Sequence, residues 1–178
     1  MTTEKERLVG RAAPPDPRRS FRLRDAHDQD GEIIASLVRA LAQYERLEHE
    51  ATATGEDFRA ALFGTPPRAH AMIAEIDGAA VGFALWFYNF STFKGRHGLY
   101  LEDIYVMPEH RGHGIGRAFF ATLAARAVAE GCARMEWSVL DWNEPAIAFY
   151  RALGAVAMDG WTVHRLTGAA LHTLAQEA

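Results

Sequence analysis

The sequence predicts an α+β (α/β-like) fold in which a mixed central sheet of about six to seven strands is flanked by helices. Short apolar runs of strand character alternate with longer stretches of helical periodicity, as in a sheet covered by helices. The pair Asp77-Gly78 joins two apolar runs, which is a strong hairpin signal. The chain has 178 residues, of which 49% are hydrophobic and 24% charged. That length and composition suit one soluble globular domain.

The first half of the chain divides into a polar extension and five elements. Residues 1–20 contain prolines and have no hydrophobic period, so we expect a flexible N-terminal extension before a domain that covers residues 21–178. Helical spacing places six residues on one stripe: Ile33, Ile34, Leu37, Val38, Leu41 and Tyr44. The expected elements are a strand over 21–24, helices over 30–48 and 54–64, and two strands over 69–88.

The second half is expected to begin with a polar loop over residues 89–98. An apolar run then leads, through a glycine-rich turn, into a long amphipathic helix that stops at Gly131. A further helix has Asn143 near its cap and Gly154 just past its end. The remaining expected elements are strands over 133–140 and 160–166 and a final helix over 168–178.

Charge and cysteine content narrow the class of protein. The formal net charge is −4, which argues against nucleic acid as a partner and is compatible with a cationic small molecule. Cys132 is the only cysteine, so an internal disulfide is impossible. The sequence has no apolar run of membrane-spanning length and no signal-peptide pattern, so we expect no membrane partner and a cytoplasmic location.

The turn Arg111-Gly112-His113-Gly114-Ile115-Gly116 stands directly between a strand and a helix. Backbone N–H groups at a helix N-terminus lack intrahelical partners and carry the positive end of the helix dipole. Glycines let a ligand approach these groups, and Arg111 and Arg117 add charge, so the turn is a candidate pyrophosphate site. The ending of a nucleotide-triphosphate loop is absent, and the glycine spacing differs from the dinucleotide fingerprint. The alternative is a tight turn with surface arginines.

Two acids, Glu102 and Asp103, interrupt the apolar strand that leads into this turn. Carboxylates inside such a strand are costly unless they are solvated or paired. Strict alternation would send them to opposite faces of the sheet, unless a β-bulge intervenes. Either acid could instead belong to a structural salt bridge.

Several stretches together resemble the GNAT superfamily of N-acetyltransferases. The strand, glycine turn and helix resemble its acyl-coenzyme A loop, and "LDWNEPAIAFYRALGA" resembles its second signature. With "LAQYE", "STFKGR" and "GWTVHRL", the resemblance runs over residues 21–166 and is greatest to the diamine (spermidine/spermine) and thialysine N-acetyltransferase branch.

The resemblance implies a single GNAT-type domain that transfers acetyl from acetyl-coenzyme A to a primary amine of a small molecule. Tyr150 would be the general acid and Glu102 a general base, acting directly or through water. The amine site would contain Tyr44, Glu45, Glu102, Asp103 and Trp161. Cofactor contacts would come from Ile104, Tyr105, Val106, Arg111, Gly112, His113, Gly114, Ile115, Gly116, Arg117, Asn143 and Tyr150.

Alternatives remain at this level. Asn143 could be only a helix cap, and Tyr150 a core residue. The acceptor could be a protein lysine, an N-terminus or an antibiotic amine, and a non-catalytic acyl-coenzyme A sensor would keep the same loop. The histidines at 97, 110 and 113 show no metal-ligand spacing, so no metal is expected. The family resemblance also implies a homodimer.

Overall fold

The computed structural model of this protein describes residues 20–178. The extension expected over residues 1–20 therefore lies outside the described residues, apart from Ser20. The chain forms two compact units that divide after Ser138. Each unit is described by itself.

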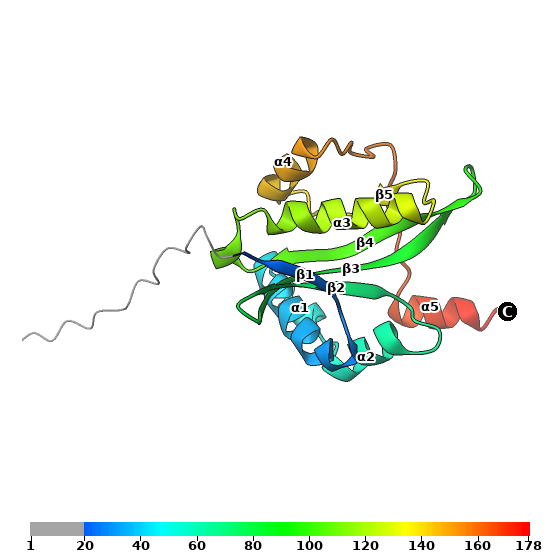
Figure 1. The fold of residues 1–178 in the computed structure, drawn as a ribbon. Coiled ribbons are helices and arrows are strands. Elements are labelled where there is room, and N and C mark those ends of the chain that lie inside the picture. The colour runs from blue at the N-terminus through cyan, green and yellow to red at the C-terminus, as the bar shows by residue number, and fades with distance from the viewer. Residues whose placement is uncertain (1–19) are drawn as a thin grey trace, which may run out of the picture. The chain divides into compact units, whose positions relative to one another are not determined.

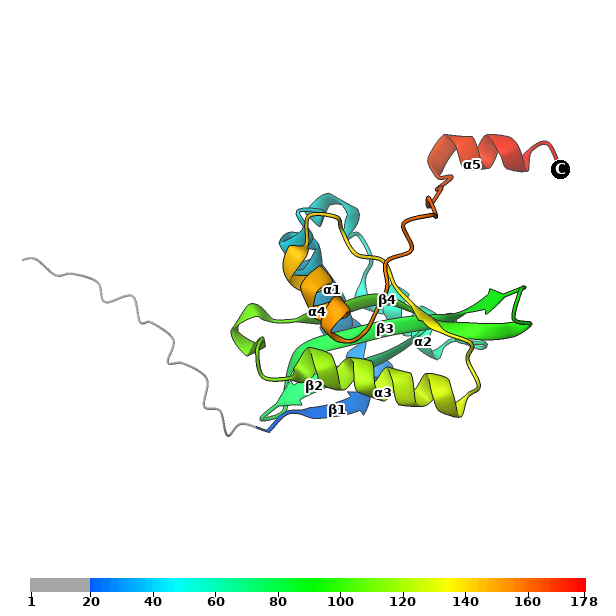
Figure 2. The same ribbon diagram turned by 90° about the horizontal axis from the view of Figure 1, so that it is seen from above.

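The first unit is built on a mixed five-stranded sheet with strand order β1-β2-β3-β4-β5 (Figures 1 and 2). Neighbouring strands are antiparallel from β1 to β4, and β5 runs parallel to β4. The α+β class is confirmed. The strands are β1 (Arg22–Asp25), β2 (His70–Ile76), β3 (Ala79–Ser91), β4 (Arg96–Val106) and β5 (Met135–Glu136).

The predicted hairpin forms at Asp77-Gly78, where φ is 52° and 80°. Positive φ at both central residues matches the twist of the flanking strands, which explains the Asp-Gly pair. The polar loop expected over residues 89–98 is wrong in extent. Strands β3 and β4 continue through most of it, and the chain reverses only between Ser91 and Arg96.

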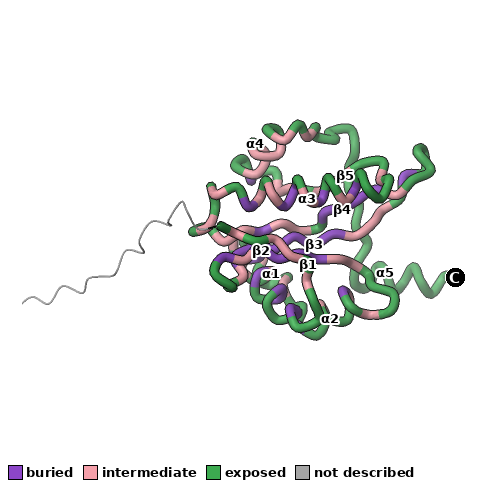
Figure 3. The backbone as a smooth tube through the Cα atoms, viewed as in Figure 1, coloured by how far each residue is buried: buried purple, intermediate pink, exposed green. Residues whose placement is uncertain are grey.

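Helices cover both faces of this sheet, with α3 (Ile115–Ala129) on one side and α1 (Gly31–Glu45) and α2 (Gly55–Phe63) on the other (Figure 1). Short 3₁₀ turns, η1 (Asp28–Asp30), η2 (Glu48–Glu50) and η3 (Pro108–His110), complete the unit. Purple, buried residues line the inner sides of these layers in Figure 3. The cluster below the sheet joins α1 and α2 to the strands and contains Ile34, Leu37, Leu41, Leu62, Ala71, Ile73, Phe83, Leu85 and Tyr105.

The second unit contains α4 (Glu144–Ala152) and α5 (Gly168–Ala175) and no strand among residues 139–178. The expectation of six to seven strands is therefore too high for the described residues. The strand expected over 160–166 is absent and its apolar residues are exposed, Trp161 by 73% and Val163 by 84%. The strand expected over 133–140 shrinks to two residues. Alternating apolar residues form a strand only where a neighbour supplies hydrogen bonds and burial.

No helix within residues 20–178 is long and apolar enough to cross a bilayer.

Candidate active site

A β-bulge interrupts β4 at Glu102. Leu85 of β3 pairs with Asp103, but the next residue, Trp86, pairs with Leu101. Glu102 is thus the extra residue on β4, and its side chain is exposed. A bulge adds one residue to one strand and re-aims the side chains that follow. Strict alternation of Glu102 and Asp103 between the two faces of the sheet, which the sequence analysis made conditional on the absence of a bulge, therefore does not apply.

The bulge changes which side of the sheet Asp103 faces. Residues directly opposite in an antiparallel pair project to the same face. Asp103 is opposite Leu85, which belongs to the core cluster beneath α1. Leu101 is opposite Trp86, whose ring lies 5.1 Å from the guanidinium carbon of Arg126 on α3. If Glu102 paired as an ordinary strand residue instead of forming a bulge, Leu101 and Asp103 would face the same side.

Three carboxylates consequently lie close enough to interact, because the charges of Glu102 and Glu45 both act on Asp103. Burial, together with the charges of Glu102 and Glu45, raises the pKa of Asp103 to about 6. Burial also raises the pKa of Glu45, the last residue of α1. The helix ends there because Arg46 adopts a left-handed conformation, with φ of 62°. The resulting acidic cluster, Glu45, Glu102 and Asp103, suits a cationic ligand.

Replacing Asp103 with asparagine is expected to stabilise the protein above pH 6. A folded-state pKa of about 6 lies above the unfolded value, so ionisation of Asp103 favours unfolding. Its contribution to stability is fully present below about pH 4 and is lost as the pH rises through 6. Asp103→Asn should therefore gain up to about 3 kcal/mol at pH 8 and nothing at pH 4.

Thermal unfolding curves of both proteins between pH 4 and 8 measure this difference. Asp159→Asn, at an exposed position of the second unit, is the control and should show no such pH dependence. Equal gains at pH 4 and pH 8 would mean that Asp103 is not held near its neutral form.

Strand β4 is paired on both sides over only a short length. Its parallel partner β5 meets it at Leu99 and Tyr100. From Leu101 to Val106, β4 pairs with β3 alone among the described strands. Its second edge can accept an extended ligand as an added strand.

The glycine-rich turn follows the end of this open edge and leads into α3. Gly112 and Gly114 have φ of 79° and 84°, which a residue with a side chain rarely adopts. Ala118 is the residue whose N–H bonds the carbonyl of Gly114, at 2.9 Å, so the N–H groups before it have no acceptor within the helix. No acidic residue lies in the first turn of α3, and its cap residue offers no side-chain acceptor. The helix start therefore remains available to an anion.

Side chains hold this turn in place. Ile115 is 1% exposed and anchors the first turn of α3 in the core. The ring Nδ1 of His113 lies 2.9 Å from the carbonyl oxygen of Arg111, to which it donates as an N–H. Arg117 is exposed on the first turn. The structure thus brings the predicted residues of the turn, 111–117, together at one helix start.

Arg111 connects the turn to α1, a contact that the sequence did not reveal. Its guanidinium carbon lies 4.5 Å from the ring centroid of Tyr44 and 5.6 Å from that of Tyr105. Its Nε donates to the carbonyl of Val106 at 2.9 Å. The bond to Val106 uses one of five N–H donors of the guanidinium group. Tyr44, Tyr105 and Arg111 form a cation–π stack beside the open edge of β4.

A family model described as the acetyltransferase (GNAT) family matches residues 26–155, which include the bulged strand, the turn and α4. The chain belongs to this family. It is an enzyme, an acetyl-coenzyme A-dependent N-acetyltransferase.

Curated relatives agree with this assignment, and a solved structure shares the fold. A thialysine N-epsilon-acetyltransferase from Bos taurus is 40% identical over 86% of this chain and 96% of its own. The enzyme of the same name from Caenorhabditis elegans is 32% identical over 89% and 99%. An integron cassette protein from V. cholerae has a similar fold, with a TM-score of 0.75 and 24% identity over 88% of this chain and 98% of its own.

The second unit of this acetyltransferase carries the remaining predicted residues. Asn143 is buried and caps α4, where its side-chain oxygen accepts from the N–H of Ala146 at 3.4 Å. The cap that the sequence suggested is therefore formed. Tyr150 lies on α4 and is half-buried, with its ring 5.5 Å from that of Phe149. Trp161 follows in an exposed segment without regular structure.

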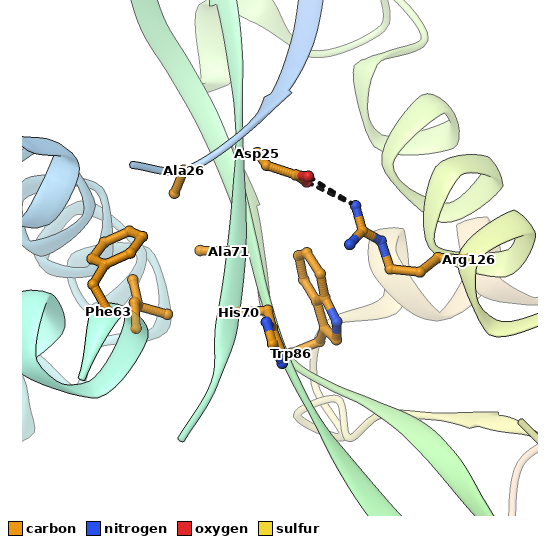
Figure 4. A pocket seen from close by; sticks show the side chains of 8 residues that line it. Asp25, Ala26, Phe63, His70, Ala71, Trp86 and Arg126 are labelled. Atoms are coloured by element: carbon orange, nitrogen blue, oxygen red, sulfur yellow. Dashed lines mark hydrogen bonds and ion pairs between the residues drawn. The ribbon is translucent and has the colours of Figure 1, made fainter. Parts of the chain in front are cut away.

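A cavity of about 120 Å³ in the acetyltransferase lies apart from all of the predicted residues. Figure 4 shows Asp25 of β1 in an ion pair with Arg126 of α3, beside Trp86 and His70. The oxygen and nitrogen of this ion pair are 2.8 Å apart, so the cavity's charges are matched. No sequence pattern predicts this cavity, because its lining comes from five separate segments: Asp25, Ala26, Leu62, Phe63, His70, Ala71, Trp86 and Arg126.

Proposed function

We propose that the enzyme transfers acetyl from acetyl-coenzyme A to a primary amine of a small molecule, such as thialysine or a diamine, by direct attack in a ternary complex. The observation that carries this proposal is the bulge at Glu102. It supports an acidic cluster next to a strand edge that leads into the turn proposed to bind an anion. The similarity to thialysine N-epsilon-acetyltransferases supports a small amine as acceptor.

Acetyl-coenzyme A would bind along the open edge of β4 and the turn after it. The backbone of Ile104, Tyr105 and Val106 would pair with the pantetheine arm as an added strand. Residues 111–117 would hold the pyrophosphate through backbone N–H groups and the two arginines. Asn143 is a proposed further contact to the pantetheine. The Nε of Arg111 already donates to the carbonyl of Val106. A pantetheine arm paired with Val106 would therefore lie beside the Arg111 side chain.

The amine would bind at the acidic cluster. Glu45 and Asp103 would supply counter-charge for a cationic group, and Tyr44 an aromatic surface. Trp161 of the second unit is proposed as a further contact. Glu102 would accept a proton, directly or through water, because an ammonium ion has no lone pair with which to attack.

In the proposed reaction, the free amine nitrogen attacks the thioester carbonyl carbon and a C–N bond forms. The nitrogen then gives up a proton to solvent and the C–S bond breaks, which leaves the amide. The coenzyme A thiolate takes a proton from the Tyr150 hydroxyl, which regains one from solvent. Backbone donors of β4 would stabilise the oxyanion, and proximity would supply much of the acceleration. Burial, with the charge of Glu130, raises the pKa of the Cys132 thiol, which disfavours an acetyl-cysteine intermediate.

A screen of small amines with acetyl-coenzyme A, followed by release of free thiol, tests the substrate class. We expect thialysine and short diamines to be acetylated and spermine to be poor. Lys94 and Arg96 lie in and beside the turn between β3 and β4, and their charge opposes a long polycation. Efficient spermine turnover with none on thialysine would contradict the proposal.

Saturating acetyl-coenzyme A is expected to raise the melting temperature by roughly 5–10 °C, because a ligand at 100 times its Kd adds about 2.7 kcal/mol. Arg111→Ala should reduce this shift, since it removes charge from the turn and the stack on Tyr44 and Tyr105. Differential scanning fluorimetry with and without ligand measures the shift.

Arg59→Ala is the matched control for this experiment. Arg59 is exposed on α2 and pairs with Glu56 at 2.9 Å, so its loss should leave the ligand-induced shift unchanged. If acetyl-coenzyme A leaves the melting temperature of the wild-type protein unchanged, the proposed cofactor site is wrong.

We further propose a cytoplasmic homodimer. Family resemblance supports the dimer, and the use of one cysteine without a disulfide partner supports a reducing compartment. Each chain has a mass of 19.7 kDa, so light scattering separates monomer from dimer directly.

A further inference from the structure

Three metal-ligating side chains meet at the end of the first unit that lies away from the turn. The ligand atoms of His97, Glu130 and Cys132 all lie within 4.8 Å of one another. None of these residues belongs to the site proposed for acetyl transfer. Their positions in the sequence do not match a metal-ligand spacing, and the fold brings His97 next to Glu130 and Cys132.

The end of α3 explains why Cys132 lies beside Glu130. Gly131 adopts φ of 73°, and its N–H bonds the carbonyl of Val128 at 3.1 Å. The N–H of Cys132 bonds the carbonyl of Ala127 at 2.8 Å. These two bonds form a Schellman motif, which turns the chain back at the end of the helix.

Strand β4 brings His97 to the same place. The carbonyl of His97 accepts from the N–H of Ala133 at 2.8 Å, so the backbone after Cys132 is tied to the start of β4. The imidazole ring lies edge-on to Tyr88, with centroids 5.6 Å apart. Both His97 and Cys132 are half-buried, which limits competition from water.

A hydrogen bond orients the third side chain. The Tyr88 hydroxyl donates to a carboxylate oxygen of Glu130 at 2.5 Å. Hydrogen bonds of this kind to a ligating carboxylate are common around bound metals, because they fix its direction. The other carboxylate oxygen remains for a cation.

We propose that His97, Glu130 and Cys132 form a binding site for a divalent transition metal, with zinc as the best match. Zinc accepts thiolate, imidazole and carboxylate ligands, at about 2.0–2.3 Å, whereas magnesium and calcium prefer oxygen. Such bond lengths place tetrahedral ligands roughly 3.3–3.8 Å apart, so the side chains close by about 1 Å on binding. Three protein ligands leave a fourth position for water.

The metal would stabilise the fold and would take no part in acetyl transfer. His97 and Val106 are near opposite ends of β4, and a strand rises about 3.3 Å per residue, so roughly 30 Å separates them. The metal would link the start of β4 to the end of α3, two segments that no disulfide can join.

The test uses the full chain after removal of metal with a chelator. Titration with zinc is expected to show one ion per chain, to raise the melting temperature and to slow alkylation of Cys132. Magnesium at the same concentration should produce none of these three effects. Cobalt(II) should give the thiolate charge-transfer band that reports a Co–S bond.

Variants separate the site from adventitious binding. His97→Ala and Cys132→Ser should each raise the zinc Kd at least about tenfold, and Tyr88→Phe should raise it less. His49→Ala is the matched control, because His49 and Glu50 form an exposed pair, 3.5 Å apart, without a thiol. Chelated samples of each variant should melt cooperatively, which shows that they are folded.

Three results would overturn the proposal: no zinc bound at an excess of metal, zinc binding that survives Cys132→Ser unchanged, or a cobalt complex without the thiolate band. Acetyl transfer by the chelated enzyme is a separate measurement, so failure of this proposal leaves the proposed function untouched.

Discussion

Replacing Tyr150 with phenylalanine is expected to lower turnover by roughly 100-fold or more, which is the usual range for loss of a general acid. The change removes only a hydroxyl group, so the ring and its packing against Phe149 remain. Amine affinity should stay nearly constant, because the proposed proton transfer follows amine attack. Steady-state kinetics with both substrates varied measures turnover and KM separately.

Tyr100→Phe provides the matched control. Its hydroxyl bonds the Ser138 hydroxyl at 2.9 Å and has no proposed part in the reaction. This variant should keep turnover within about twofold of wild type, as a surface substitution would. If Tyr150→Phe also stays within about twofold and merely melts earlier, Tyr150 is a packing residue of α4 and another group protonates the thiolate.

Replacing Glu102 with glutamine should lower turnover about 100-fold near neutral pH. Glutamine keeps the size of the bulged residue but cannot accept the amine proton. Part of the loss should be recovered at high pH, where more of the amine is already unprotonated. Turnover followed from pH 6 to 10 for both enzymes measures the recovery.

The control for Glu102→Gln is Glu32→Gln. Glu32 is exposed and lies in the first turn of α1, whereas Glu45 of the acidic cluster is the last residue of that helix. The Glu32→Gln enzyme should show the same dependence of turnover on pH as the wild type. A Glu102→Gln enzyme with an unchanged profile and only a lower melting temperature would assign the strand acids to stability, and solvent would then deprotonate the amine.

Local signals account for the elements that could be predicted from the sequence. The turn from 111 to 117 was predictable because glycine conformation and helix starts depend on neighbouring residues. The Asp77-Gly78 hairpin and the end of α4 at Gly154, where φ is 90°, belong to the same kind. The stripe of α1 was largely correct, although its predicted member Ile33 is 38% exposed.

Features that depend on distant partners were not predictable. The bulge could be stated only as a condition, because the pairing of β3 with β4 decides where the extra residue falls. The stack of Arg111 on Tyr44 joins α1 to the turn, and the metal-ligand cluster joins β4 to the end of α3. The strand expected over 160–166 failed for the opposite reason, since its pattern found no partner strand within the described chain.

The bulge at Glu102 makes the pairing register of β4, and not only its composition, a constraint on the protein. If Glu102 paired as an ordinary strand residue, the ladder would be continuous and Asp103 and Tyr105 would turn toward α3. The acidic cluster and the stack on Arg111 would then be lost together. A deletion between Ser91 and Arg96 only shortens a surface turn, which tolerates changes of length. Deleting Glu102 would remove the bulge and keep the pairs on either side of it. Comparing this deletion with one in the surface turn, for folding and cofactor binding, would show what the bulged residue itself contributes.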